Sequence, residues 1–146
     1  MNALPDDLPD CMVFWLAKAY QRAHAVFKAR LVPYGLTNLQ HLVLEALWYR
    51  PGITAAQMSK MLTLDKATLS GILDRMVRGD WITKSASPGD RRQMALFTTA
   101  KADSHKQTLI RERKEANNRL MSEFTTEERI LFKRFLMDMV RENEQV

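Results

Sequence analysis

The chain has 146 residues, of which 46% are apolar and 27% are charged, and its formal net charge at pH 7 is +5. These values predict a single soluble domain spanning 1–146 and exclude a disordered chain. A lone cysteine, Cys11, excludes an internal disulfide and a multi-cysteine zinc site, and because neither a secretory signal nor a membrane-spanning apolar run is expected, the predicted location is the cytoplasm.

A first helix is expected from about residue 8 to residue 31, and a second from 37 to 49. In both stretches apolar side chains recur at helical spacing, and a proline and a glycine follow each one. The predicted inward stripe of the first helix is Val13, Leu16, Tyr20, His24, Phe27 and Leu31. That of the second helix is Leu39, Leu42, Val43, Ala46 and Leu47.

A short third helix, 54–62, is followed closely by a fourth, 65–79. Thr37, Thr54 and the later Thr125 each precede Gln or Glu by three residues, which is the capping-box pattern of a helix start, and Asp65 is a good N-cap. The predicted apolar face of the fourth helix is Leu69, Ile72, Leu73, Met76 and Val77. Its outward side, small near the start and basic near the end, is Ala67, Thr68, Ser70, Gly71, Asp74, Arg75 and Arg78.

Two short strands, 81–84 and 94–98, are predicted to form a hairpin around the turn-forming sequence Ser-Pro-Gly-Asp. A long helix then follows from 99 to about 123, and a last helix from about 126 to 141. The predicted inward face of the last helix is Leu131, Phe132, Phe135, Leu136, Met139 and Val140. The expected fold class is therefore mainly α with a small β-hairpin (α+β).

Basic residues are denser in the middle of the chain than at its ends. Residues 54–98 carry a net charge of +3, which leaves +2 for the rest of the chain. A single helix has the right width for a major groove of DNA, and an arginine on a thin loop can reach the neighbouring minor groove. A tight helix pair beside an arginine-tipped hairpin therefore predicts binding to double-stranded DNA.

The segment 64–77 and the sequence Asp90-Arg91-Arg92, followed by Leu-Phe-Thr at 96–98, resemble the MarR family of bacterial transcriptional regulators. The likeness extends over nearly the whole chain. It implies a winged helix-turn-helix over 37–98, with N- and C-terminal dimerisation helices in 8–33 and 99–143. It also implies a homodimeric repressor that binds a pseudo-palindromic operator near its target promoters and is released by a small, aromatic ligand. The chain departs from the family pattern at Lys101, where a glycine is usual.

The same resemblance assigns DNA contacts on the fourth helix to Thr68, Ser70, Gly71 and Arg75. It makes Arg92 the minor-groove arginine of the wing, with Asp90 as the carboxylate that orients it. A bidentate pair between these two side chains, and hydroxyl donation by Thr68 and Ser70 to phosphate or base, are the expected contacts. Further predicted DNA contacts, mainly with phosphates, come from Lys66, Arg78, Lys84 and Arg91.

Aromatic and histidine side chains in the first two helices allow two interpretations. They are predicted either to line a small-molecule cavity or to be ordinary core and interface residues: Phe14, Trp15, Tyr20, His24, His41 and Trp48. The three histidines have no supporting acidic cluster, so neither a metal nor another cofactor is expected.

Two alternative functions compete with DNA-dependent regulation. One is a protein–protein adaptor with a degenerate winged helix, and the other is a thiol-based redox sensor that uses Cys11, although no basic residue adjoins this cysteine in the sequence. An enzyme is not expected, because the sequence contains no phosphate-binding loop, no nucleophile elbow and no paired catalytic carboxylates.

Overall fold

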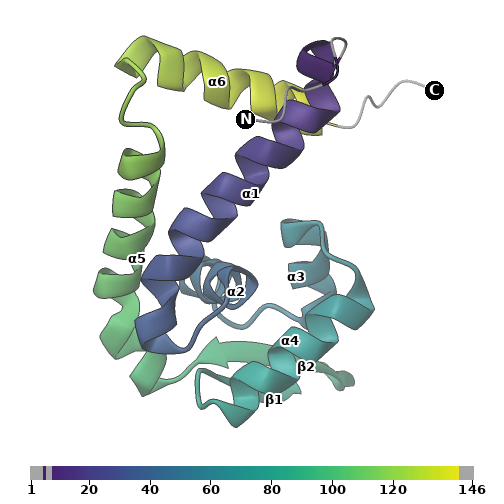
Figure 1. Ribbon diagram of the computed structural model, residues 1–146. Helices are drawn as coiled ribbons and strands as arrows, with labels where there is room; N and C mark the ends of the chain where they lie inside the picture. Colours follow the sequence, from purple (N-terminus) through teal and green to yellow (C-terminus); the bar gives the residue numbers. More distant parts are fainter. Residues whose placement is uncertain (1–4, 6–7, 142–146) are drawn as a thin grey trace, which may run out of the picture.

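The computed structural model describes residue 5 and residues 8–141, with Arg91 described by its backbone alone. The elements in chain order are η1 (Leu8–Asp10), α1 (Met12–Leu31), η2 (Val32–Tyr34), α2 (Asn38–Tyr49), α3 (Ala55–Leu62), α4 (Lys66–Arg78), β1 (Ile82–Ser87), β2 (Asp90–Thr98), α5 (Ala100–Leu120) and α6 (Thr126–Val140) (Figure 1). The predicted fold class, mainly helical with one antiparallel hairpin, is confirmed. Among the residues described, we find no helix with the length and apolar character needed to cross a membrane.

The predicted capping boxes form at the starts of α2, α3 and α6. In each, the threonine hydroxyl accepts a hydrogen bond from the backbone N–H three residues later, and the Gln or Glu side chain at that position accepts one from the threonine N–H. Thr99 caps α5 and Asp65 caps α4 in the simpler one-bond form. These caps satisfy N–H groups that the first turn of a helix leaves without partners.

The boundaries of the first helix, of the two strands and of α5 differ from the sequence-based expectation. The first α-helix begins at Met12, because residues 8–10 form a separate 3-10 turn whose Pro9 carbonyl accepts the indole N–H of Trp15 at 2.7 Å. The strands are longer than predicted, since β1 and β2 continue to the hairpin tip. Most side chains near the tip are exposed, so alternation between apolar and polar residues is absent there. The helix α5 ends at Leu120, three residues earlier than predicted, before a turn into α6.

The core lies between α2, α4 and the hairpin, and α1 and α5 close one side of it. Its largest fully buried side chains include Leu31, Leu44, Leu47, Met58, Leu69, Leu73, Met76, Ile82, Leu96 and Leu109. Leu39, Leu42 and Val77, which the sequence pattern placed inward, remain 38%, 40% and 41% exposed. Leu44, which the pattern omitted, is fully buried because core elements surround α2 on more than one side.

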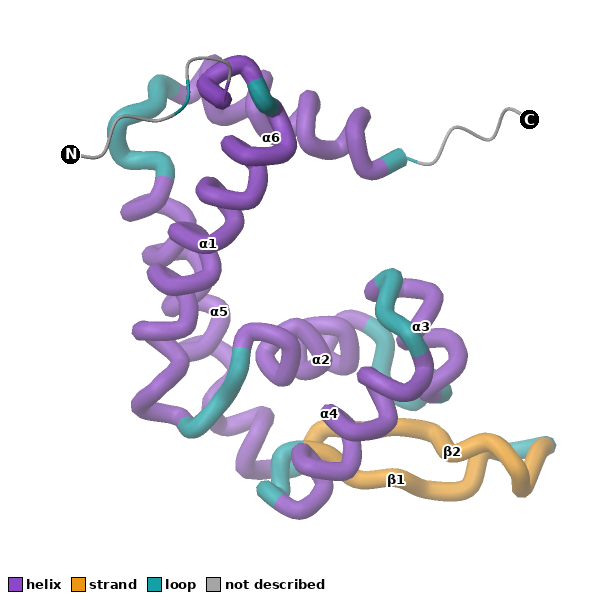
Figure 2. The backbone as a smooth tube through the Cα atoms, turned by 45° about the vertical axis from the view of Figure 1, so that its right-hand side comes forward, coloured by secondary structure: helices purple, strands orange, loops and turns teal. Residues whose placement is uncertain are grey.

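The helices α1 and α6 present apolar faces that the described residues leave partly uncovered. Figures 1 and 2 show α6 lying across the N-terminal half of α1, at the end of the molecule opposite the hairpin. No residue of α6 is buried, and Phe135 and Val140 are 52% and 79% exposed. On α1, Val13 is 76% exposed. The predicted inward faces of α1 and α6 are therefore only partly buried within one copy of the chain.

Candidate nucleic-acid interface

The turn between α3 and α4 is short and fixed by local hydrogen bonds. Thr63 ends α3 in the left-handed conformation, with φ of 53°. The Ser59 hydroxyl donates to the Leu64 carbonyl at 2.5 Å, while the Leu64 N–H donates to the Ser59 carbonyl at 3.1 Å. Asp65 then caps α4. These contacts join the two helices as a compact helix-turn-helix.

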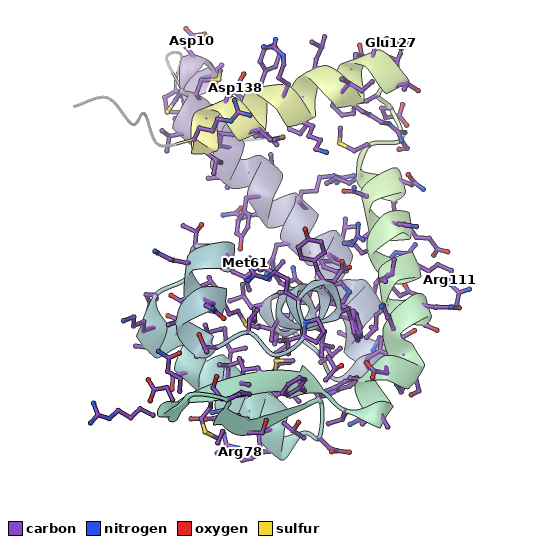
Figure 3. The ribbon with its side chains drawn as sticks, turned by 180° about the vertical axis from the view of Figure 1, so that it is seen from behind. Asp10, Met61, Arg78, Arg111, Glu127 and Asp138 are labelled. Carbon is purple, nitrogen blue, oxygen red and sulfur yellow. The ribbon has the colours of Figure 1, made fainter. Side chains whose placement is uncertain are left out.

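The outer side of α4 is exposed and basic. The helix packs against the core through four buried side chains, Leu69, Ile72, Leu73 and Met76. The predicted contacts Lys66, Thr68, Ser70, Arg75 and Arg78 are all exposed, and Figure 3 shows Arg78 at the outer end of this part of the molecule. A side-chain carbon added at Gly71 would meet nothing within 4 Å, so packing within the chain does not require glycine there.

The Thr68 side chain already has a hydrogen-bond partner within the chain. Its hydroxyl donates to Asp65 Oδ2 at 2.5 Å, and its backbone N–H donates to Asp65 Oδ1 at 2.8 Å. These bonds, the side-chain one first, lower the pKa of the Asp65 carboxyl. This geometry therefore does not favour the expected hydrogen bond from the Thr68 hydroxyl to DNA. The side chain instead presents its methyl group and an oxygen that can accept a hydrogen bond.

Lys84 forms an ion pair with α4, while its predicted contact with a phosphate stays a prediction. Its Nζ lies 2.9 Å from Oδ1 of Asp74, and this contact ties β1 to α4. The hydrogen bond from Lys84, followed by its positive charge, lowers the pKa of the Asp74 carboxyl. The pair fixes the wing relative to α4, a role that the sequence-based assignment of Lys84 did not include.

The wing carries its arginines on a bulge. Ser87 pairs with Asp90 around a tight turn in which Gly89 has φ of 99°, a value suited to glycine. The next pair joins Ala86 to Met94, so residues 91–93 have no partner on β1. A β-bulge changes the direction in which side chains point and interrupts the regular pairing of the two strands. Arg92 is exposed on this bulge, whereas the predicted contact through the Arg91 side chain lies outside what the structure describes.

The contact of Asp90 differs from the expected bidentate pair. Its Oδ1 accepts a hydrogen bond from the backbone N–H of Arg92 at 2.9 Å, rather than from the guanidinium. Asp90 therefore shapes the backbone of the bulge, and the charged group of Arg92 is left to point into solvent. Figure 2 shows the hairpin projecting beyond α4 as an arm.

The base of the hairpin is anchored to the loop before α3. Thr54 forms an isolated antiparallel bridge with Ala95, and the Leu96 carbonyl accepts from Gly52 N–H at 2.8 Å. The Leu96 N–H donates in turn to Ile53 at 3.0 Å. The sequence contained no visible signal for this third strand-like segment, because it is only a few residues long.

The six residues predicted for a ligand cavity do not gather around one space. Phe14 and Trp15 contact each other near the start of α1, with ring centroids 5.2 Å apart, and Tyr20 lies 5.7 Å from His24 farther along the helix. Trp48 donates its indole N–H to Asp103 Oδ1 at 2.9 Å, at the junction of α2 with α5.

His41 is a core residue. It is 1% exposed, its Nε2 lies 3.2 Å from the Leu109 carbonyl, and its ring meets that of Phe27 edge to face. Burial lowers the pKa of this imidazole, and the nearby Glu45 carboxylate offsets only part of that effect. For His41 and Trp48, the interpretation as structural residues is the one that the contacts favour.

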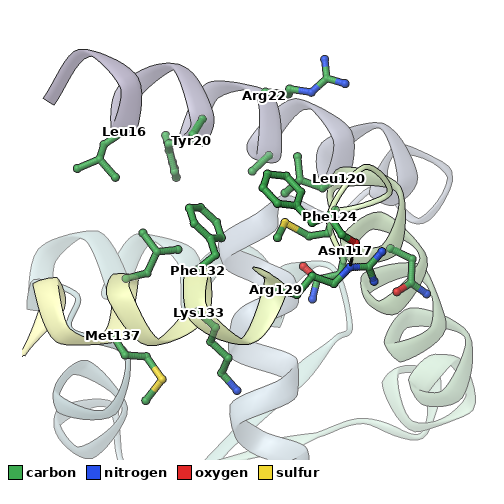
Figure 4. A pocket seen from close by; sticks show the side chains of 15 residues that line it. Leu16, Tyr20, Arg22, Asn117, Leu120, Phe124, Arg129, Phe132, Lys133 and Met137 are labelled. Atoms are coloured by element: carbon green, nitrogen blue, oxygen red, sulfur yellow. Dashed lines mark hydrogen bonds between the residues drawn. The ribbon is translucent and has the colours of Figure 1, made fainter. Parts of the chain in front are cut away.

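A cavity lies elsewhere, between α1, α5 and α6 (Figure 4). It measures about 980 Å³, and of the six predicted residues only Tyr20 lines it. Figure 4 shows Phe132 and Phe124 beside this space, with Arg22 on α1 at its edge. The cavity belongs to the same incompletely covered apolar region as the exposed faces of α1 and α6.

Cys11 occupies the position just before α1. It is half-buried and makes no side-chain capping bond. The structure thus adds no contact that would mark this thiol as a sensor.

Comparisons with known proteins agree with this geometry. A sequence model of the MarR family matches residues 36–94. The HTH-type transcriptional repressor NicR of Pseudomonas putida is 27% identical over 144 residues, covering 99% of this chain and 91% of NicR.

Two solved structures share the fold. BpsR of Bordetella bronchiseptica, described in a study of how 6-hydroxynicotinic acid regulates its DNA binding, superposes with a TM-score of 0.87 at 21% identity, covering 97% of this chain and all of that one. A mutant MarR from E. coli complexed with operator DNA superposes with a TM-score of 0.86 at 18% identity, covering 95% of this chain and all of that one.

Proposed function

We propose that the chain is a MarR-family homodimeric transcriptional repressor that binds a pseudo-palindromic DNA operator and is released by a small ligand, because residues 36–94 match the MarR family and NicR is similar over 144 residues. The family consists of transcriptional regulators rather than enzymes. In this proposal the protein acts in the cytoplasm on promoters near its own gene.

The observation that carries the proposal is the placement of two basic features side by side. The exposed face of α4 bears Arg75 and Arg78, and the adjacent wing bears Arg92 on a bulge that Asp90 shapes. A helix of this kind fits the major groove, and an arginine is suited to a narrow minor groove of concentrated negative potential. We therefore assign α4 as the recognition helix and the hairpin as the wing of a winged helix-turn-helix over 37–98.

The uncovered apolar faces support a dimer built by the segments 8–33 and 99–143. Monomeric proteins rarely expose large contiguous apolar patches. Here α6 has no buried residue, and Ile130, Phe135 and Met139 are 64%, 52% and 61% exposed. A second copy that covers α1 and α6 would bury these side chains and hold two recognition helices at a fixed distance. Two helices on one face of DNA require half-sites about 10–10.5 base pairs apart.

Relief by a ligand follows from that fixed distance. A ligand that binds more tightly to a dimer with the wrong spacing shifts the population away from the DNA-binding form. BpsR makes an aromatic acid the first effector to test, because 6-hydroxynicotinic acid regulates DNA binding by BpsR. Of the predicted ligand residues, Tyr20 and His24 remain our candidates, since they neighbour each other on α1.

The experiment that tests the proposal is selection of bound sites from randomised duplexes, with and without 6-hydroxynicotinic acid. Recovery of a palindrome with half-sites one helical turn apart supports the dimeric repressor. A protein that binds no duplex at near-physiological salt, yet binds an acidic protein, would instead be the adaptor. Mobility shifts with the upstream DNA of its own gene, before and after peroxide treatment, also test the sensor alternative: unchanged affinity excludes Cys11 as a switch.

A further inference from the structure

The first residues of the α5 segment hold the C-terminal end of α4. The Thr99 hydroxyl donates to the Asp80 carbonyl at 2.7 Å, and the Thr99 N–H donates to the Trp81 carbonyl at 3.1 Å. Lys101 Nζ donates to the Gly79 carbonyl at 2.8 Å. Three consecutive carbonyl groups that follow α4 thus accept hydrogen bonds from Thr99 and Lys101 at the start of α5. We call this contact the α4–α5 junction.

The Lys101 ammonium occupies a site that favours positive charge from two sides. Gly79 is the C-cap of α4, where carbonyl groups concentrate the negative end of the helix dipole. On the other side, Nζ lies 4.3 Å from the centre of the Trp81 ring, and aromatic faces attract cations. Trp81 is itself only 7% exposed and packs against His105 of α5, so the ring is a fixed surface.

At the α4–α5 junction, a small change in the angle between the two helices has a large effect on where the far end of α5 lies relative to α4. The helix α5 runs from Ala100 to Leu120 and packs against α1, so it connects the wing with the proposed dimer interface. At 1.5 Å per residue, these 21 residues span about 31 Å. The angle between α4 and α5 therefore determines how far apart two recognition helices lie in a dimer.

We propose that Lys101 is a positioning residue that fixes the angle between the recognition helix and α5 through its contacts with Gly79 and Trp81. This inference rests on the proposed DNA-binding function. Lys101 is not assigned a contact with DNA: its charge acts on the protein, by holding α4 in the orientation that matches both half-sites at once. The rival explanation is a direct phosphate contact, since the side chain is exposed.

The two explanations predict different salt dependence. Each phosphate-contacting lysine contributes about 1 to the slope of log affinity against log salt concentration for duplex DNA. A positioning residue contributes nothing to that slope. Its replacement weakens binding to the operator, which needs both recognition helices in register. Binding to unrelated DNA, which depends on overall charge, changes no more than when a lysine elsewhere on α5 is replaced.

The test compares Lys101→Met, Lys101→Arg and a control, Lys114→Met. Methionine keeps an unbranched chain over the Trp81 ring and removes the ammonium, while arginine restores a charged donor. Lys114 is an exposed residue of the same helix and makes no hydrogen bond or ion pair among the contacts of the described residues, so its replacement removes equal charge. Affinities for the selected operator and for an unrelated duplex are measured at several salt concentrations, with sedimentation and thermal melting as checks of assembly and folding.

We expect Lys101→Met to weaken operator binding about fivefold, the effect of one lost hydrogen bond, with an unchanged salt slope, and to change affinity for the unrelated duplex no more than Lys114→Met does. Lys101→Arg should recover most of the loss, and Lys114→Met should affect both duplexes equally. Wild-type affinity in Lys101→Met overturns the inference, and a slope reduced by about 1 assigns Lys101 to a phosphate instead. Should Lys101→Met not fold, Lys101→Gln replaces it with the same expected outcomes.

A failure of the proposed function looks different from a failure of this inference. In the first case the wild-type protein selects no duplex at all. In the second case the wild-type protein binds its operator and Lys101→Met binds it equally well.

Discussion

The Nζ atom of Lys84 on β1 lies 2.9 Å from Oδ1 of Asp74 on α4, so one ion pair connects the hairpin with α4. Asp74 is the only acidic residue within α4, where the proposed DNA surface is otherwise basic or neutral. While the pair is intact, the positive charge of Lys84 neutralises a carboxylate that would repel phosphates.

Replacement of Lys84 alone should therefore harm DNA binding more than replacement of both partners. In Lys84→Ala the Asp74 carboxylate is left unpaired beside the duplex, and operator affinity is expected to fall. In Lys84→Ala/Asp74→Asn much of that loss should be recovered, with a salt slope close to that of the wild type. A double-mutant cycle of operator affinities measures the coupling. A slope reduced by about 1 in both variants would show instead that Lys84 contacts a phosphate.

Arg92→Ala is expected to lower operator affinity by roughly 10- to 100-fold, because a well-placed arginine contact in a groove is worth about 1–3 kcal/mol. The exposed side chain at the bulge does not support the core, so thermal stability should remain unchanged. Arg111→Ala serves as the control, since Figure 3 shows Arg111 projecting from the outer side of α5. Equal losses for the two variants in a mobility-shift titration would contradict a specific role for the wing.

Gly71→Ala should raise stability and weaken DNA binding at the same time. An interior helical glycine is about 0.5–1 kcal/mol less favourable than alanine, and the added carbon meets nothing within 4 Å. We therefore expect a higher melting temperature. The same methyl group adds bulk to the face of α4 that we assign to the major groove. Unchanged operator affinity in the more stable variant would show that α4 does not approach DNA closely at this residue.

The pH dependence of stability should show the effect of His41. Because burial lowers the pKa of this imidazole in the folded state, the unfolded chain binds its proton first as the pH falls. Stability is therefore highest above the unfolded pKa of about 6.5 and decreases as the pH drops below it, toward the lower folded value.

His41→Gln removes the titration while offering a side-chain amide that can donate to the Leu109 carbonyl. Denaturant unfolding of the wild type and of His41→Gln between pH 8 and pH 5 checks the prediction. A wild-type curve that stays flat down to pH 5 would contradict the buried, neutral form of His41.

Phe135→Asp on α6 should prevent dimer assembly and leave folding of the single chain intact. Phe135 is 52% exposed in one chain, so a monomer tolerates the change, whereas a partner surface would have to bury the new carboxylate. Sedimentation should report a monomer, and operator binding should be lost. Tyr49→Asp, at an 80% exposed aromatic residue of α2, is the matched control and should remain dimeric. A dimeric Phe135→Asp protein would remove α6 from the proposed interface.

Local signals in the sequence predicted the helix starts well. The pairing of Thr37 with Gln40, and of Thr54 with Gln57, is a contact over three residues and can be read directly from the chain. The apolar faces of α2 and α4 were largely correct for the same reason, because helical spacing shows which residues share a side. Leu39 and Leu42 were misplaced, since periodicity does not reveal how many neighbours surround a helix.

Contacts between residues far apart in the sequence could not be predicted from such local signals. The Lys84–Asp74 pair depends on the packing of β1 against α4, and the pairing of Thr54 with Ala95 joins segments 41 residues apart. The predicted ligand residues failed to form one group because α1 spreads them along its length. For α6, sequence patterning indicated an inward face, yet among the residues that the structure describes none of this helix is buried.

The interrupted pairing at the hairpin tip also bears on how the protein behaves at high concentration. A two-stranded arm that extends into solvent offers free backbone groups to strands of other molecules, which is a common route to fibrous aggregates. The unpaired residues 91–93 distort β2 where it is farthest from the core, and Arg92 adds charge that repels an identical neighbour. The irregularity that carries the proposed wing arginine thus also keeps the arms of separate molecules from adding to one another edge to edge.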